Sequence, residues 1–273
     1  MPRIDIDEVL REKAPRFAKY IPRFVRNWLR RTIHEEALND ILAAGWNRPP
    51  QEFIHVAFER MRIAYRIDGL ERLDPAERYL FVANHPFGGL DGMMIADALI
   101  ERFGDARVVV NDLLMHVEPL QPIWLPVNKH GRQTAAYARR YDEAFAGELP
   151  ILTFPAGLCS RRRDGVVSDT PWRLNFIKRA HASGRKIVPL YVEGRLSDFF
   201  YRIARLRERL GIKLNVEMLW LPDEMFRQRG KDFRIRFGKP VPWQRLDDGK
   251  PAKVWAERLR EYVYKLKNEQ KNG

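Results

Sequence analysis

A histidine and an aspartate lie close together in a glycine-rich stretch, Phe81-Val-Ala-Asn-His-Pro-Phe-Gly-Gly-Leu-Asp-Gly92. An imidazole has an ordinary pKa near 6.5, so His85 can take a proton from a hydroxyl near neutral pH. Asp91 can accept the hydrogen on the other ring nitrogen and fix the tautomer. Gly88 and Gly89 allow a substrate to approach the backbone closely. The pattern predicts a general base that activates a hydroxyl of the substrate.

The same residues also have a purely structural interpretation. In that case His85 is a turn residue, and Asp91 is the N-cap of a helix that begins at Gly92. A single His and Asp pair does not decide between the two interpretations. Other stretches of the chain must do so.

Strand-like and helix-like segments alternate around this stretch. We expect strands over 78–83, 106–111, 150–154, 186–192 and 233–237, and helices over 35–44, 92–102, 133–147, 172–183 and 252–267. The alternation predicts an α/β fold with a largely parallel central sheet flanked by helices. His85 then follows a strand, where sites form in such sheets. We expect a helical arm over 1–50 and a catalytic domain over 51–273.

The composition limits the partners and the location. The chain has 273 residues, with 49 Lys and Arg against 36 Asp and Glu, so its net charge is +13. That charge favours polyanions, either nucleic acid or anionic lipid headgroups. The single cysteine, Cys159, cannot form an internal disulfide, which favours the cytoplasm. No apolar run approaches the roughly 20 residues of a membrane span, and the first residues do not resemble a signal peptide.

The segment 13–31 holds seven basic residues and no acid. We expect one helix here that starts near Pro15 and is kinked at Pro22. Its spacing of three and four residues predicts a basic stripe beside an apolar one, as in helices at a bilayer interface. The basic stripe comprises Arg16, Lys19, Arg23, Arg26 and Arg30, and the apolar one Phe17, Ile21, Phe24 and Trp28. A helix that packs Phe17 and Trp28 onto its own core is the alternative.

Four stretches, in order, resemble the motifs of the glycerolipid and lysophospholipid acyltransferase superfamily. The first is Asn84-His85-Pro86 with Asp91, followed by Trp124-Leu-Pro-Val-Asn-Lys129. The third is Ile151-Leu-Thr-Phe-Pro-Ala-Gly-Leu-Cys-Ser160 with Arg161 and Arg162, and the fourth is Ile187-Val-Pro-Leu-Tyr-Val192. A Gly-Lys-Pro element follows at Phe237-Gly-Lys-Pro-Val241. Each match alone is unspecific, but four in the family's order are informative.

The resemblance implies a role for each matched position. His85 is the expected general base, and Asp91 its orienting partner. Lys129, Gly157, Ser160, Arg161 and Arg162 are expected to line an anion site for the headgroup of the acceptor. The implied reaction needs no metal, no cofactor and no covalent enzyme intermediate, because a hydroxyl attacks a bound acyl thioester directly.

Two positions depart from the family's pattern. Five residues separate His85 from Asp91, where four are usual, and the double glycine can absorb the extra one. Ala156 stands where a glutamate usually helps to hold the acceptor. The Phe-Pro-Ala-Gly sequence is similar to a bacterial subgroup labelled hemolysins or ornithine- and glycine-lipid O-acyltransferases.

Other residues suggest no competing catalytic site. The remaining histidines lack paired metal-ligand spacing, and Cys159 is expected to be inert. The aromatic and basic stretch 198–207 can be a nucleic-acid surface, but Phe199, Ile203 and Leu206 at helical spacing favour a packed amphipathic helix.

The sequence therefore predicts an enzyme that moves an acyl group from acyl carrier protein or coenzyme A to a lysolipid hydroxyl. The acceptor is expected to be lysophosphatidic acid or a lyso amino-acid lipid, and the location peripheral on the cytoplasmic face of an anionic membrane. Two alternatives stay open. One is a basic nucleic-acid binding protein, which lacks a recognised binding motif here, and the other is a hydrolase of lipid esters that uses the same His and Asp pair.

Overall fold

The computed structural model describes residues 3–13, 15–127, 134–247 and 249–268. The chain divides into two compact units, each built from segments that are separate in the sequence. The first unit comprises Met1–Ile63, His116–Leu120 and Leu196–Lys231, and the second comprises Ala64–Met115, Gln121–Arg195 and Asp232–Gly273. The expected division into an arm over 1–50 and a domain over 51–273 stays a prediction.

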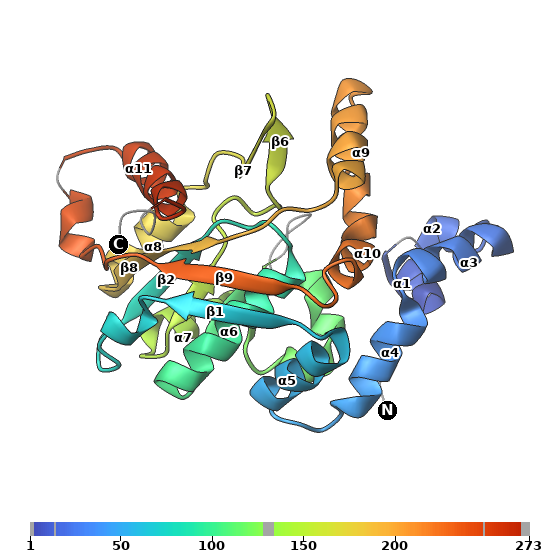
Figure 1. The fold of residues 1–273 in the computed structure, drawn as a ribbon, viewed down its shortest axis with the longest axis horizontal. Coiled ribbons are helices and arrows are strands. Elements are labelled where there is room, and N and C mark those ends of the chain that lie inside the picture. The colour runs from blue at the N-terminus through green and yellow to red at the C-terminus, as the bar shows by residue number, and fades with distance from the viewer. Residues whose placement is uncertain (1–2, 14, 128–133, 248, 269–273) are drawn as a thin grey trace. The chain divides into compact units, whose positions relative to one another are not determined.

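A seven-stranded sheet forms the centre of the second unit (Figure 1), in the order β1-β9-β8-β2-β5-β3-β4. Neighbouring strands are parallel except β8 and β9, which are antiparallel. The bounds are β1 Ala64–Asp68, β2 Tyr79–Ala83, β3 Arg107–Asn111, β4 Trp124–Val127, β5 Ile151–Thr153, β8 Lys186–Val192 and β9 Asp232–Phe237. The largely parallel central sheet predicted from the sequence is confirmed.

Helices flank this sheet, and the side chains of β2 show why. The helices are α6 Gly89–Phe103, α7 Ala135–Ala146, α8 Asn175–Ser183 and α11 Ala252–Lys265. Leu80 and Val82 belong to a buried cluster that includes residues of α7, α8 and α11. The rings of Tyr79 and Phe81 instead lie 5.9 and 6.0 Å from the ring of Phe103 in α6. Both faces of β2 are covered, so the strand is apolar at every position.

The five strands and five helices expected from the sequence all exist, with most ends shifted by one to three residues. The strand at the edge of the sheet, β1, was not expected. Its burial alternates and it includes the polar Arg66, so it lacks the apolar run of a central strand. A short hairpin of β6 Arg161–Arg163 and β7 Val166–Ser168 was also missed. Short 3₁₀ helices lie at η1 Leu70–Arg72 and η5 Trp243–Asp247, and a third, η2 Asp112–His116, has all residues but His116 in this unit.

The first unit is mainly helical. Its elements are α1 Ile6–Lys13, α2 Pro15–Ala18, α3 Arg23–Thr32, α4 Glu35–Ala44, α5 Pro50–Met61, η3 Glu118–Leu120, α9 Asp198–Arg209, η4 Val216–Trp220 and α10 Leu221–Phe226. Within the described residues, no helix is both long enough and apolar enough to cross a bilayer.

The single helix expected over 13–31 is wrong. A helix begins at Pro15 as expected, but it ends at Ala18, and α3 begins after Pro22. Pro22 has extended backbone angles and lacks an N–H, and a proline also disfavours the helical conformation at the residue before it, here Ile21. The chain therefore breaks at Pro22 instead of bending, and the basic stripe is not continuous.

Two arginines of the expected stripe are engaged inside the first unit. Arg26 donates to the carboxylate of Asp7 at 3.1 Å and to the carbonyl of Ala18 at 2.8 Å. Arg30 also pairs with Asp7 and lies 3.7 Å from a carboxylate oxygen of Glu35. These two cations hold α3 to its neighbours, which leaves Arg23 as an exposed cation of α3.

Candidate active site

The loop between β2 and α6 places the two predicted catalytic side chains. Gly88 precedes α6 with a φ of +80°, a conformation that a residue with a Cβ adopts only at a cost, and the helix begins at Gly89. Asp91 therefore lies in the first turn and is not the N-cap. The helix starts three residues earlier than expected.

The loop brings His85 and Asp91 together. Nδ1 of His85 lies 2.9 Å from Oδ2 of Asp91, whose side chain is fully buried. The same oxygen accepts hydrogen bonds from the amides of Phe87 at 2.9 Å and Gly88 at 3.1 Å. A carboxylate in the first turn of a helix is also stabilised by the helix dipole. Asp91 thus holds the first turn of α6 from its third position and also faces the imidazole. The N-cap interpretation is wrong, but a structural role at the start of the helix is compatible with the catalytic one.

Burial raises the pKa of Asp91 above its ordinary value, while His85 and the amides of Phe87 and Gly88 act in the opposite direction. The net direction is upward, so the ionised carboxylate is costly to hold at this position. A positive imidazolium at His85 would offset that cost. The carboxylate of Asp91 is therefore placed to stabilise a positive charge that develops on the neighbouring imidazole.

The ring of His85 is held in a defined plane. It stacks on Phe154, with the ring centroids 4.0 Å apart and the planes 26° apart. The side chain is 18% exposed, and Nε2 has no hydrogen-bond partner within the part of the chain that is described. With Nδ1 directed to Asp91, Nε2 is the nitrogen that a substrate hydroxyl can reach.

The predicted motifs converge on His85 in space. Phe154 follows β5, and the amide of Ser160, six residues later, donates to the carbonyl of His85 at 2.8 Å. On the other side of β2, the side chain of Asn84 makes two hydrogen bonds to the backbone of Val192, at 2.7 and 2.9 Å. The first motif is therefore joined to the third and to the end of the fourth.

Asp169 organises this junction and was not identified from the sequence. Its buried carboxylate accepts hydrogen bonds from the amide of His85 at 3.2 Å, the hydroxyl of Ser160 at 2.7 Å and the indole of Trp172 at 2.9 Å. Its own amide donates to the hydroxyl of Tyr264 at 2.7 Å. Asp169 follows an unpredicted hairpin in a polar segment, and no spacing pattern marks it.

The residues expected to bind the headgroup have different environments. The hydroxyl of Ser160 is buried against Asp169, and the amide of Gly157 donates to the carbonyl of Phe154 in a tight turn. The guanidinium of Arg161 is buried and donates to the carbonyl of Cys159 at 2.7 Å. Lys129 lies outside the described residues. The binding role of these residues stays a prediction.

Arg161 and Arg162 are neighbours on β6, so their side chains project to opposite faces of the hairpin. Only Arg161 is buried, next to Ser160, while Arg162 is half-buried. The two guanidinium groups therefore do not act as one fork. Within the described ranges, no group of three or more His, Cys, Asp or Glu side chains is placed to hold a metal ion.

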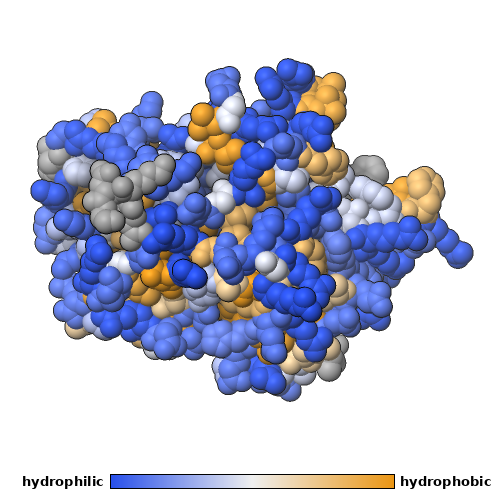
Figure 2. Space-filling view, viewed as in Figure 1, coloured by the Kyte–Doolittle hydropathy of each residue, from blue (hydrophilic) through white to orange (hydrophobic). Residues whose placement is uncertain are grey.

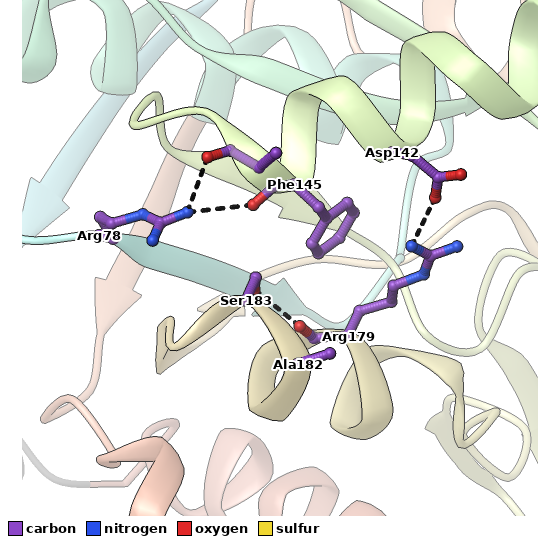
Figure 3. Close-up of a pocket in the computed structure, with 7 residues that line it drawn as sticks. Arg78, Asp142, Phe145, Arg179, Ala182 and Ser183 are labelled. Atoms are coloured by element: carbon purple, nitrogen blue, oxygen red, sulfur yellow. Dashed lines mark hydrogen bonds and ion pairs between the residues drawn. The ribbon is translucent and has the colours of Figure 1, made fainter.

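Figure 3 shows a pocket of about 340 Å³ whose lining includes Arg78, Phe145 and Arg179. It lies towards the end of β2 opposite to His85. Arg78, which lines it, precedes β2, whereas His85 follows β2. Its polar groups are paired with one another. Arg78 donates to the carbonyl of Phe145 at 3.1 Å, and Arg179 donates to Asp142 at 2.6 Å. The pocket is no part of the candidate active site.

His85 and Asp91 lie at the carboxyl end of a strand in a mainly parallel sheet, where α/β enzymes place their active sites. A histidine held by a carboxylate there is typical of an enzyme that uses general-base catalysis. The family model described as "Acyltransferase" matches residues 8–273. The chain belongs to this acyltransferase family, and the resemblance indicated by the motifs is confirmed.

Two relatives are similar along nearly their whole length. The chain is 40% identical over 264 residues to a lyso-glycine lipid O-acyltransferase of Bacteroides thetaiotaomicron, covering 96% of this chain and 97% of that protein. It is 41% identical to a lyso-glycine lipid O-acyltransferase of Phocaeicola vulgatus, covering 96% and 95%. The crystal structure of the 1-acyl-sn-glycerophosphate (LPA) acyltransferase PlsC from Thermotoga maritima is 16% identical, with a TM-score of 0.48, and covers 81% of this chain and 79% of that chain.

Proposed function

We propose that the enzyme transfers a fatty acyl group from a thioester to the hydroxyl of a lysolipid, with His85 as the general base. The observation that carries the proposal is the His85 and Asp91 pair, which leaves Nε2 open to a substrate. Its occurrence in a chain 40% identical to a lyso-glycine lipid O-acyltransferase supports this chemistry.

In the proposed reaction, Nε2 of His85 removes the proton of the acceptor hydroxyl as its oxygen attacks the thioester carbonyl. Asp91 stabilises the imidazolium that forms. The tetrahedral intermediate then collapses, the carbon–sulfur bond breaks, and the proton passes from His85 to the leaving thiolate. A new carbon–oxygen ester bond replaces the thioester. A positioned base contributes roughly 10²–10⁴ to the rate of such a step.

The proposed acceptor is a lyso amino-acid lipid, namely an N-acylated glycine with a free hydroxyl on its acyl chain. Ala156 stands where the family usually has a glutamate, so it cannot provide the carboxylate that usually contacts a glycerol-phosphate acceptor. The carboxylate of an amino-acid lipid is still an anion, and Arg161, Arg162 and Lys129 can supply positive charge for it. The names of the two relatives agree with this choice of acceptor.

We further propose that the enzyme works peripherally on the cytoplasmic face of an anionic membrane. The net charge of +13 favours such a surface, and both the acceptor and the product are membrane lipids. The thioester donor is acyl carrier protein or coenzyme A. Each of these carriers presents the same acyl thioester to His85, so the proposed chemistry holds for both.

A direct test is to supply purified enzyme with an N-(3-hydroxyacyl)glycine or with lysophosphatidic acid, each with acyl carrier protein and coenzyme A donors. Mass spectrometry should detect diacylated product, with a higher kcat/KM for the glycine lipid. A higher kcat/KM for lysophosphatidic acid would refute the proposed acceptor while retaining acyl transfer.

The same assay distinguishes acyl transfer from hydrolysis of a lipid ester. Without an acceptor, the donor thioester should stay intact, and with one the acyl group should appear on the lipid. Release of free fatty acid from the diacylated lipid, with no transfer from the thioester, would identify a lipid ester hydrolase instead.

A further inference from the structure

The end of α9 and the turn that follows expose large apolar side chains. Leu206 is 56% exposed, Leu210 64% and Leu214 67%, and Ile212 between them is also exposed. The segment is a helix as expected, but the expected packed face is wrong: Phe199 and Leu206 are exposed, and the buried residues of α9 are Phe200, Tyr201 and Ala204. Figure 2 shows hydrophobic residues beside strongly hydrophilic ones at this end of α9. A cluster of this kind marks an interaction surface.

The backbone of this turn is held by internal contacts. The amide of Ile212 donates to the carbonyl of Arg207 at 3.1 Å, and Gly211 has a φ of +67°, as at the end of many helices. Arg207 in turn donates to the carbonyl of Ile212 at 2.9 Å and lies 2.9 Å from a carboxylate oxygen of the buried Glu217. The leucines are thus presented outward by a fixed turn and are not exposed through loose packing.

Basic side chains accompany the apolar ones. Arg202, Arg205 and Arg209 are exposed at spacings of three and four, so they form one stripe along α9. The leucines at 206 and 210 form the adjacent stripe. Lys213 is exposed within the turn itself, and Glu208 is the exposed acid nearest to it on the helix. Anionic lipid headgroups are complementary to such a border of cations around aliphatic residues.

We infer that this apolar tip, defined as Leu206, Leu210, Ile212 and Leu214, docks into a lipid bilayer while Arg202, Arg205, Arg209 and Lys213 bind anionic headgroups. The inference rests on the proposed function, because an enzyme whose substrates are membrane lipids must reach the membrane surface. It assigns a membrane contact to residues far in the sequence from the basic segment 13–31. In a symmetric contact of two tips, Arg202, Arg205 and Arg209 would face like charges of the other copy, which disfavours a second copy as the occupant.

The test is co-sedimentation of the full chain with phosphatidylglycerol vesicles and phosphatidylcholine vesicles. The double variant Leu210→Ser with Leu214→Ser should weaken binding to phosphatidylglycerol vesicles about tenfold or more, the change expected when two inserted aliphatic side chains are lost. Val254→Ser, an exposed valine of α11, is the matched control and should bind as the unmodified chain does. Unchanged binding of the double variant would overturn the inference.

Two further measurements separate the possible outcomes. The double variant Arg202→Glu with Arg209→Glu should lose binding to phosphatidylglycerol vesicles without exposing any core residue. It therefore tests the surface even if the leucine variant folds poorly.

On detergent-dispersed lysolipid, the leucine variant should retain kcat within about twofold of the unmodified chain, since vesicle docking is not required there. A change in oligomeric state without a change in vesicle binding would identify a protein interface and contradict the inference. Absence of acyl transfer in every variant would count against the proposed function alone.

Discussion

The amide of Ser160 donates to the carbonyl of His85 at 2.8 Å, and the hydroxyl of the same serine donates to Asp169 at 2.7 Å. Asp169 also accepts the amide hydrogen of His85. Both backbone groups of His85, its N–H and its carbonyl, are therefore hydrogen-bonded. The position of the imidazole depends on Asp169, although this carboxylate does not touch its ring.

Asp169→Ala should lower kcat with little change in KM, because a displacement of about 1 Å at a reacting group can cost about 10²-fold in rate. It should also lower the free energy of unfolding by about 1–3 kcal/mol for each buried donor that is left unpaired. Asp169→Asn retains one acceptor oxygen and should restore part of kcat. Steady-state kinetics and urea denaturation measure both effects, with Asp40→Ala, an exposed acid of α4, as control. An equal loss in both Asp169 variants with no change in the pH profile of kcat would indicate a structural role only.

The pKa of Asp91 gives a prediction with a definite sign. Because burial raises this pKa above the unfolded value of about 3.9, the folded state binds more protons between the two values, and stability falls as the pH rises through that range. Asp91→Asn removes this cost. Relative to the unmodified chain, the variant should become more stable as the pH rises from about 4 towards neutrality, yet it should lose roughly 10²–10⁴ in kcat. Denaturation across this pH range would contradict the account if the variant lost relative stability with rising pH.

Asn84 should matter for stability more than for chemistry. Its side chain satisfies both the amide and the carbonyl of Val192, and all of these groups are buried. Asn84→Ala should lower the free energy of unfolding by at least about 1–3 kcal/mol, since the backbone groups of Val192 lose their partners. Thermal and chemical denaturation test this. An unaltered transition midpoint would show that these two hydrogen bonds contribute nothing net.

Two arginines of the basic segment 13–31 are expected to have different roles, Arg23 in membrane binding and Arg30 in stability. Arg23→Glu should weaken binding to anionic vesicles, because each cation near such a surface contributes about 1 kcal/mol. Arg30→Glu should chiefly destabilise the first unit, because Arg30 pairs with Asp7 and Glu35. Vesicle binding at low and high salt, together with denaturation, distinguishes the two variants. The reverse pattern, in which Arg23→Glu destabilises the fold and Arg30→Glu only weakens binding, would be inconsistent with the ion pairs.

Much of the second unit was predictable from the sequence because its strands are covered on both faces. Residues such as Phe81, Val82 and Leu190 form apolar runs with few alternatives. His85 and Asp91 were predictable because their motif is local, and the loop that joins them is short. β1 was missed because its burial alternates and it includes Arg66, and the break at Pro22 was interpreted as a kink because the apolar spacing continues across it.

Asp169 could not be predicted for a different reason. Its partners are His85, Ser160, Trp172 and Tyr264, which only the folded sheet and the unexpected β6–β7 hairpin bring together. Long-range hydrogen bonds of this kind leave no periodicity in the sequence. The opposite orientation of Arg161 and Arg162 was likewise not predictable, because it depends on the short strand β6, which the sequence does not indicate.

The central claim is that His85 is the base of an acyl transfer to a lysolipid hydroxyl. The most direct measurement is the rate of diacylated product formed from an N-(3-hydroxyacyl)glycine and an acyl thioester by the unmodified chain and by His85→Ala, with circular dichroism to verify that both are folded. The account predicts that His85→Ala loses roughly 10²–10⁴ in kcat while its fold is retained, because the positioned base is removed and a small side chain fits the loop. A folded His85→Ala enzyme that forms product at close to the unmodified rate would contradict the account.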